Sequence, residues 1–266
     1  MGYFRIGRKA PKMTEGLRVY AVGDVHGCFK ELAGLFQLIE RDSLGREAKK
    51  TRIIFLGDMI DRGRQSADVC RLLYDLRDYD GVVCLKGNHE KAMCDSLNGD
   101  LSALRFWMDF GGAWTMLSWG VDPKLVQNAH RGERYQWDLL DAFRAAIPRP
   151  IAQWVSELPL SHREGDYFFA HAGIRPGVPL HAQTEDDLLW IREPFLSSWR
   201  RHEAVVVHGH SESDMVTFNS NRIGVDTACY RTGCLTALGL EGNQQWTIST
   251  TDAALVALET SERATA

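Results

Sequence analysis

Five short apolar runs in this sequence share one design. Each is rich in Val, Ile, Tyr or Phe, and each contains Gly or Ala beside an Asp, Asn or His near its end. They occupy residues 17–27, 52–63, 81–90, 166–173 and 204–210. Such runs predict β-strands. Because they are apolar almost throughout, rather than at alternate positions, we expect both faces of their sheets to be covered, by helices or by a second sheet.

Helical patterns separate the first three runs. Residues 28–42 place Phe29, Leu32, Leu35 and Ile39 at helical spacing, and residues 66–79 repeat the pattern. The chain therefore begins β-α-β-α-β, which favours a parallel sheet with right-handed crossovers. We predict an α/β fold.

The middle of the chain, about residues 91–158, is helix-biased and rich in tryptophan. Strand patterns return after Gly209, and no repeat or linker marks a domain boundary. We expect a flexible basic segment at 1–16, a single domain over 17–258 with a helical insertion at 91–158, and a frayed tail at 259–266. The insertion could be a packed helical subdomain, or its aromatic residues could shape a groove for a peptide or a nucleobase.

Charge and hydropathy exclude some partners. The formal net charge is -4, so the overall balance does not indicate a nucleic-acid binder. No apolar run approaches the roughly 20 residues that a membrane helix needs, and the basic start lacks the apolar core of a secretory signal. We expect a cytoplasmic protein with no nucleic-acid or membrane partner.

Polar side chains lie in the last part of each of the five runs, where the predicted strand ends. In open α/β sheets, ligands bind beyond the carboxyl ends of the strands. The residues there are Asp24, His26, Asp58, Asp61, Arg62, Asn88, His89, His171, His208 and His210. Oxygen and imidazole donors without a thiolate are typical of a two-metal site. Asp24 and His26 are two residues apart, so an extended backbone would point both side chains to the same side, where they can bind one ion.

The motifs at these strand ends resemble those of a known family. "GDVHG" at 23–27, "GDMIDRG" at 57–63 and "GNHE" at 87–90 are similar to the three ordered motifs of the phosphoprotein phosphatase (PPP) family of metallophosphoesterases. "HAG" at 171–173 and "GHS" at 209–211 extend the resemblance over most of the chain. It implies a metallophosphoesterase-type β-sandwich flanked by helices, of the calcineurin-like kind.

The resemblance also implies a set of ligands for two divalent metal ions. Manganese is the expected metal, and iron, zinc or cobalt are alternatives, because this nitrogen and oxygen set suits all four. By this resemblance one ion is held by Asp24, His26 and Asp58, and the other by Asp58, Asn88, His171 and His210. His210 is preferred to His208, which we expect to pack beneath the site.

Four further residues take roles from the same resemblance. His89 is the general acid that protonates the leaving oxygen, and Asp61 orients it. Asn88 and His89 are neighbours on a chain that we expect to be extended, so their side chains should point in opposite directions and only Asn88 should reach the metal. Arg62 and Arg192 would bind the substrate phosphate, although Arg192 could instead pair with Glu193 at the surface.

The form of the motifs bears on the substrate. Asp61 and Glu90 follow the bacterial-type serine/threonine protein phosphatases, since the similar symmetrical diadenosine tetraphosphatases tend to have Ala and Asp there. We expect hydrolysis of phosphoserine and phosphothreonine in a phosphoprotein or phosphopeptide, by direct attack of a metal-bridging hydroxide. The alternative is a symmetrical diadenosine tetraphosphatase or a broad-specificity nucleotide phosphohydrolase. A catalytically silent metal-binding scaffold is a third reading, which the complete residue set disfavours.

Overall fold

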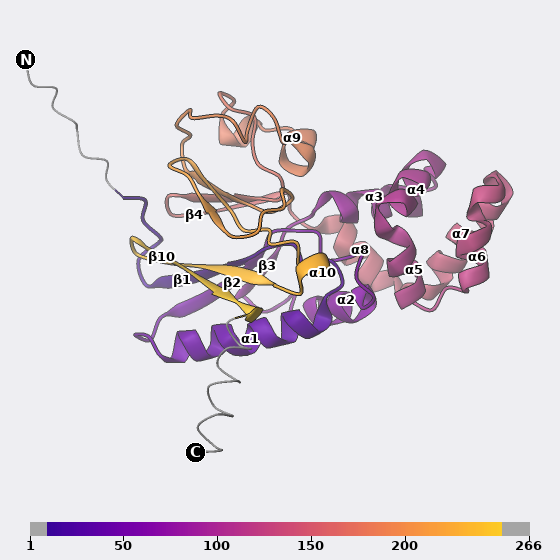
Figure 1. Cartoon of the computed structure of the whole chain (residues 1–266), viewed down its shortest axis with the longest axis horizontal. Helices are drawn as coiled ribbons and strands as arrows, with labels where there is room; N and C mark the ends of the chain where they lie inside the picture. The colour runs from indigo at the N-terminus through magenta and orange to yellow at the C-terminus, as the bar shows by residue number, and fades with distance from the viewer. Residues whose placement is uncertain (1–9, 252–266) are drawn as a thin grey trace, which may run out of the picture.

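The computed structural model of the chain describes residues 10–251. Two five-stranded sheets lie one above the other (Figure 1). The first has the order β10-β9-β1-β2-β3, with bounds Gln244–Ser249, Thr236–Glu241, Leu17–Val22, Lys50–Phe55 and Val82–Cys84. The second has the order β4-β5-β6-β8-β7, with bounds Ser161–Glu164, Tyr167–Ala170, Val205–His208, Arg222–Gly224 and Thr217–Phe218.

The predicted parallel start is confirmed. Strands β1, β2 and β3 pair in parallel, with Leu17 opposite Lys50 and Ile53 opposite Val82. Helices α1 (Phe29–Leu44) and α2 (Ser66–Asp75) make the two crossovers. In the second sheet β5, β6 and β8 are also parallel. The parallel strands of both sheets bring their carboxyl ends to the region where the predicted site residues lie.

Apolar side chains divide the molecule into layers. Between the sheets, one core contains Val19 and Ile54 from the first and Phe169 and Val207 from the second. Helix α1 packs on the outer side of the first sheet, and α9 (Glu185–Trp190) packs on the outer side of the second. The sheets are therefore covered on both faces, as the unbroken apolar runs predict.

A helical segment separates β3 from β4 and gathers at one end of the molecule (Figure 1). Its elements are α3 (Asn88–Leu97), α4 (Leu101–Trp107), the π-helical η1 (Met108–Gly112), α5 (Ala113–Ser118), α6 (Pro123–Asn128), the 3-10 helix η2 (Ala129–Arg131), α7 (Glu133–Ala146) and α8 (Arg149–Glu157). Two short elements follow elsewhere in the chain, η3 (Leu180–Ala182) and α10 (Cys229–Thr232). The helical segment shares one apolar core with α1, α2 and the first sheet.

The ends of the chain lie partly outside the described residues. This applies to residues 1–9 of the segment predicted to be flexible and to the whole predicted tail at 259–266. Within the described part of the first segment, Met13 is buried and its backbone N–H donates to the carbonyl of Gly242 at 2.7 Å. Across residues 10–251, no helix combines the length and the apolar character needed to cross a membrane.

Candidate active site

The polar residues at the strand ends converge on one pocket of about 290 Å³. It is lined by Asp24, His26, Asp58, Arg62, Asn88, His89, Phe106, Phe110, Trp190, Arg192 and His210. His171 lies behind this lining, fully buried, with its Nε2 atom 2.8 Å from Asn88 Oδ1. Every residue predicted for catalysis, phosphate binding or metal binding lines the pocket, except His171 and Asp61, which contact its lining.

The backbone at this site adopts conformations that side chains rarely allow. Among the described residues, six non-glycine residues have positive φ: His26, Asp58, Asp61, Arg62, His210 and Ala228. The first five belong to the predicted site. Each such residue costs of order 1–3 kcal/mol and persists only where the surrounding structure enforces it. The turns aim the side chains into the pocket. They also correct the sequence argument for Asp24 and His26, since a φ of 44° at His26 breaks the extended geometry assumed there.

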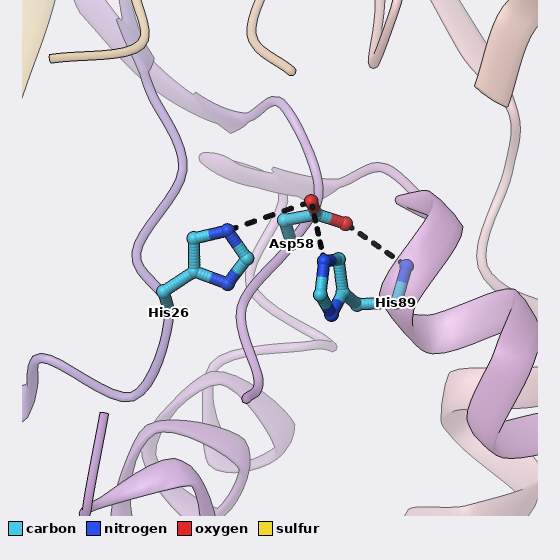
Figure 2. A group of neighbouring side chains, drawn as sticks. All are labelled: His26, Asp58 and His89. Carbon is cyan, nitrogen blue, oxygen red and sulfur yellow. Dashed lines mark hydrogen bonds and ion pairs between the residues drawn. The ribbon is translucent and has the colours of Figure 1, made fainter. Parts of the chain in front are cut away.

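One group of potential metal ligands contains His26, Asp58 and His89, whose ligand atoms lie within 4.8 Å of one another. Figure 2 shows the two imidazoles on either side of the Asp58 carboxylate. The Nε2 atoms of His26 and His89 each lie 3.7 Å from Asp58 Oδ2. His26 donates from Nδ1 to the carbonyl of Ile60 at 2.8 Å, which directs the lone pair of Nε2 toward the carboxylate.

A second group contains Asp58, His171 and His210. His171 donates from Nδ1 to the carbonyl of Leu56, and its Nε2 lies 3.4 Å from Asp58 Oδ2 and 3.2 Å from His210 Nδ1. Asp58 is thus common to both groups. A residue common to both groups would be the one able to contact two ions, which is the role that the resemblance implies for Asp58.

The donor set fits divalent cations. His26 and His171 both give Nδ1–H to a backbone carbonyl, the arrangement by which proteins fix the tautomer of a metal-ligating histidine. Their Nε2 lone pairs then face the oxygens of Asp58 and, for His171, of Asn88, so acceptor atoms converge without donors between them. Burial lowers the pKa of His26 to about 3, which keeps the imidazole neutral and able to bind a metal.

Neighbouring buried carboxylates at the site favour the binding of a cation. Burial, together with the charges of Asp226 and Asp58, raises the pKa of Asp24 well above its ordinary value. The Asp24 carboxylate accepts the backbone N–H of His210 at 3.1 and 3.2 Å. This contact links the end of the first sheet to the end of the second. A cation at this site would offset the repulsion among the three carboxylates.

Glu90 has a structural role that sequence reasoning missed. Its fully buried carboxylate accepts backbone N–H groups from Asp58, Met59, Ile60 and Gly87 at 2.8 to 3.2 Å. Glu90 therefore holds the turn that presents Asp58 to the pocket. These hydrogen bonds explain why a glutamate stands at position 90 without reference to the substrate. The sequence argument that Glu90 favours a phosphoprotein substrate is weakened accordingly.

His89 is held by a hydrogen bond to Asp61. Its Nδ1 donates to Asp61 Oδ2 at 2.6 Å, which leaves Nε2 directed toward the pocket. Burial would lower the pKa of His89, but the charges of Asp58 and Asp61 and the Asp61 hydrogen bond together raise it to about 9. Asn88 and His89 lie in the first turn of α3 and not on a strand, so helical rotation separates their side chains. His89 also belongs to the first ligand group, so proximity alone does not separate it from the ligands.

The helical segment supplies two unpredicted contacts to Asp61. Trp107 donates from Nε1 to Asp61 Oδ2 at 2.6 Å, and the Thr115 hydroxyl donates to Asp61 Oδ1. The Thr115 hydroxyl also accepts the backbone N–H of Asp61 at 2.9 Å. Both residues are fully buried. The segment therefore fixes the carboxylate that orients His89.

The two predicted phosphate-binding arginines lie at the rim of the pocket. Arg62 contacts Glu212 at 3.0 Å, and its guanidinium lies 4.6 Å from the ring centre of Tyr230. Arg192 donates to the carbonyl of His210 at 3.1 Å and to the Ser211 hydroxyl, which places it beside the site. The alternative pairing of Arg192 with Glu193 is not among the ion pairs of residues 10–251.

The sequence of residues 17–234 matches the calcineurin-like phosphoesterase family. The chain belongs to that family. Since the match covers well over half of the chain, the predicted resemblance and the α/β sandwich fold are confirmed.

Two relatives and one solved structure illustrate the range within this calcineurin-like phosphoesterase family. A symmetrical bis(5'-nucleosyl)-tetraphosphatase of Methylococcus capsulatus is 30% identical over 160 residues, which are 60% of this chain and 44% of that protein. A protein of the same name from Nitrosospira multiformis is 25% identical, covering 85% of this chain and 93% of that one. A protein serine/threonine phosphatase from Saccharomyces cerevisiae has the same fold, with a TM-score of 0.51, 17% identity and coverage of 90% and 84%. The chain spans about half the length of the Methylococcus protein, 44%, and of a protein of the same name from Aromatoleum aromaticum, 52%.

Two other polar residues of this calcineurin-like phosphoesterase lie outside the ligand groups. His208 is buried, its pKa is lowered to about 4 by burial, and its ring packs edge-on against Phe195 at 5.1 Å. Burial raises the pKa of Asp226 to about 6, and this carboxylate accepts the backbone N–H of Ala228 at 2.8 Å. The packing of His208 agrees with the position expected for it from the sequence.

Proposed function

We propose that this phosphoesterase hydrolyses dinucleoside tetraphosphates. This substrate class is that of the alternative function expected from the sequence. The observation that carries the proposal is the pocket itself, where metal-type ligands, two arginines and three aromatic side chains share one cavity. The names of the two relatives support the same substrate class. The Glu90 contacts also remove part of the sequence argument for a protein phosphatase, since they account for this residue without reference to substrate.

In this proposal the chain's own residues bind and orient the substrate. Asp24, His26, Asp58, Asn88, His171 and His210 would hold two divalent ions, with manganese as the expected metal. When bound, such ions lower the pKa of a coordinated water and neutralise phosphoryl oxygens. Arg62 and Arg192 would hold the phosphate at the rim by charge-assisted hydrogen bonds. His89 would give a proton from Nε2 to the leaving oxygen, while its Nδ1–H keeps the hydrogen bond to Asp61.

A second candidate is hydrolysis of phosphoserine and phosphothreonine. It is favoured by the Asp61–Arg62–Gly63 sequence and by the strong orientation of His89. An alkoxide is a poor leaving group and gains about 10²- to 10⁴-fold from a positioned acid. The leaving ADP of a tetraphosphate needs this proton less. The two candidates therefore differ in how strongly they depend on His89.

The decisive experiment compares two substrates on the manganese-loaded protein. Diadenosine tetraphosphate and a phosphothreonine peptide are offered at equal concentration, and the products are separated by chromatography. We expect the dinucleotide to give ADP alone, at the higher kcat/KM. In His89→Asn, turnover of the dinucleotide should fall less than turnover of the peptide.

The control variants separate the site from the rest of the surface. Asp58→Asn should abolish turnover of both substrates, while Asp138→Asn, an exposed carboxylate on α7, should match the wild type. Preference for the peptide would reject the proposed substrate and support the second candidate. Loss of activity in Asp138→Asn would show that the assay does not report on this site.

A further inference from the structure

Three aromatic side chains form one side of the active-site pocket, and we call them the aromatic wall: Phe106, Phe110 and Trp190. The ring centres of Phe106 and Phe110 lie 4.4 Å apart with planes tilted by 33°, close to an offset stack. Trp190 meets Phe106 edge-on at 5.5 Å and 70°. Such geometry leaves the outer ring faces available to another planar group.

Two members of the wall, Phe106 and Phe110, are exposed, and Trp190 is partly buried. Phe106 and Phe110 are 39% and 47% exposed, whereas Trp107 between them is fully buried against Asp61 and Phe143. Leaving two large aromatic side chains in water gives up the stabilisation that burial would provide. Their exposure at the mouth of a charged pocket therefore points to a ligand.

The backbone that carries the wall is shaped by the phosphate-binding loop. Phe110 lies in the π-helical η1, and such π-helical turns occur frequently at functional sites. Gly111, next to Phe110, has φ +110°, and a Cβ there would lie 3.0 Å from the backbone nitrogen of Arg62. Only glycine allows this approach without strain. The turn thus docks the wall directly on the loop of Arg62.

The remaining lining residues indicate what kind of group the wall would take. Apart from the wall, every lining side chain belongs to the predicted metal ligands, to His89 or to the two arginines. A peptide substrate would bring backbone N–H and C=O groups that need hydrogen-bond partners. Apart from the wall, the lining has no polar side chain other than the predicted metal ligands, His89 and the two arginines. A nucleobase has a planar face that stacks on aromatic rings without such partners.

We infer that the aromatic wall is the stacking subsite for the nucleobase of a nucleotide substrate, whose phosphates extend from it to Arg62 and Arg192. The inference rests on the proposed function. The wall provides ring faces and, in the indole N–H of Trp190, a single hydrogen-bond donor, so it binds adenine and guanine with little discrimination.

Steady-state kinetics with two substrates test this subsite. Diadenosine tetraphosphate carries bases, and inorganic tripolyphosphate carries none. In Phe110→Ala the KM for the dinucleotide, divided by the KM for tripolyphosphate, should rise roughly five- to 100-fold, the range expected for loss of one stacked base. Phe110→Trp should bring this ratio back toward the wild-type value. Phe218→Ala, which removes another exposed aromatic side chain outside the pocket, should leave the ratio at the wild-type value.

Each result decides for or against the subsite. An unchanged ratio in Phe110→Ala, with the dinucleotide still hydrolysed, overturns the subsite and leaves the proposed function standing. If the wild type hydrolyses a phosphopeptide but no dinucleotide, the proposed function fails. The subsite is then judged by calorimetric titration of the manganese-loaded protein with ADP and with pyrophosphate. Weaker binding of ADP alone in Phe110→Ala supports the subsite, and equal weakening of both ligands overturns it.

Discussion

The floor and the wall of the pocket are built in opposite ways. We call the six predicted metal ligands the site floor: Asp24, His26, Asp58, Asn88, His171 and His210. Five of them are at most 5% exposed, and hydrogen bonds between side chains and the backbone hold the rings of His26 and His171 and the turn at Asp58. In the aromatic wall, Phe106 and Phe110 of the helical segment are exposed, and Trp190 of α9 is partly buried. Under the two proposals above, the floor would fix the chemistry for every substrate, whereas the wall would select among substrates.

The largest effect is expected from the residue that holds the floor. Glu90→Gln replaces one acceptor oxygen with an NH₂ group that faces backbone N–H donors. We expect the free energy of unfolding to fall by about 3 kcal/mol, since hydrogen bonds to a buried charged group are lost. Turnover should fall for dinucleotide and phosphopeptide alike. Urea denaturation and steady-state assays measure the two effects.

The control for this change is Glu40→Gln, an exposed glutamate on α1, which should change neither quantity. If Glu90→Gln lost activity toward one substrate only, the floor would not serve all substrates alike, and its distinction from the wall would be wrong.

A smaller effect is expected from Trp107, which joins the helical segment to the floor. Trp107→Phe keeps an aromatic ring in the core but removes the hydrogen bond to Asp61 Oδ2. Because Thr115 still bonds the other carboxylate oxygen, we expect kcat to fall by about tenfold, the equivalent of one hydrogen bond to a charged group. Steady-state kinetics on both substrates measure this, with Trp137→Phe, a change of an exposed tryptophan, as the control. A change in KM without a change in kcat would show that Trp107 acts on substrate binding, like the wall, and not through Asp61.

Glu212 should have a weaker influence, through Arg62. It contacts Arg62 at 3.0 Å and Arg231 at 3.4 Å, and its side chain is 32% exposed. Ion pairs at this exposure are worth about 0–1 kcal/mol, so Glu212→Gln should raise KM by no more than about fivefold for every phosphate substrate. Initial-rate measurements at low salt test this. A lower KM in the variant would show instead that Glu212 competes with phosphate for Arg62.

The smallest effect is expected from the hydroxyl of Tyr230. It donates to Glu212 at 2.9 Å, while the ring lies beneath the Arg62 guanidinium and 5.4 Å from the His26 ring. Tyr230→Phe keeps the ring, so KM should change by less than about threefold, whereas Tyr230→Ala should exceed that. Equal effects of the two variants would show that the ring contributes nothing to the placement of Arg62.

The sequence predicts the floor because strand ends obey a general rule. Parallel strands bring their carboxyl ends to one region, so Asp58 and His171 can be placed together although 113 positions separate them in the chain. The contacts of Trp107 and Thr115 could not be predicted, since their helical spacing says which face is buried but names no partner. Glu90 left a signal, because it stands three residues after Gly87 at a helix start, the spacing of a capping residue. The wall forms because the turn at Gly111 and the end of α9 come together in space. No local sequence pattern predicts that contact.

The Glu90 contacts have a consequence for solvent exchange in this molecule. The amides of Asp58, Met59 and Ile60 lie in a loop, where backbone hydrogens ordinarily exchange with water quickly. Here they donate to a fully buried carboxylate, so their exchange requires α3 to separate from β2. These loop amides should therefore exchange as slowly as those of the sheet, and their deuterium uptake reports directly on whether the turn that presents Asp58 is intact.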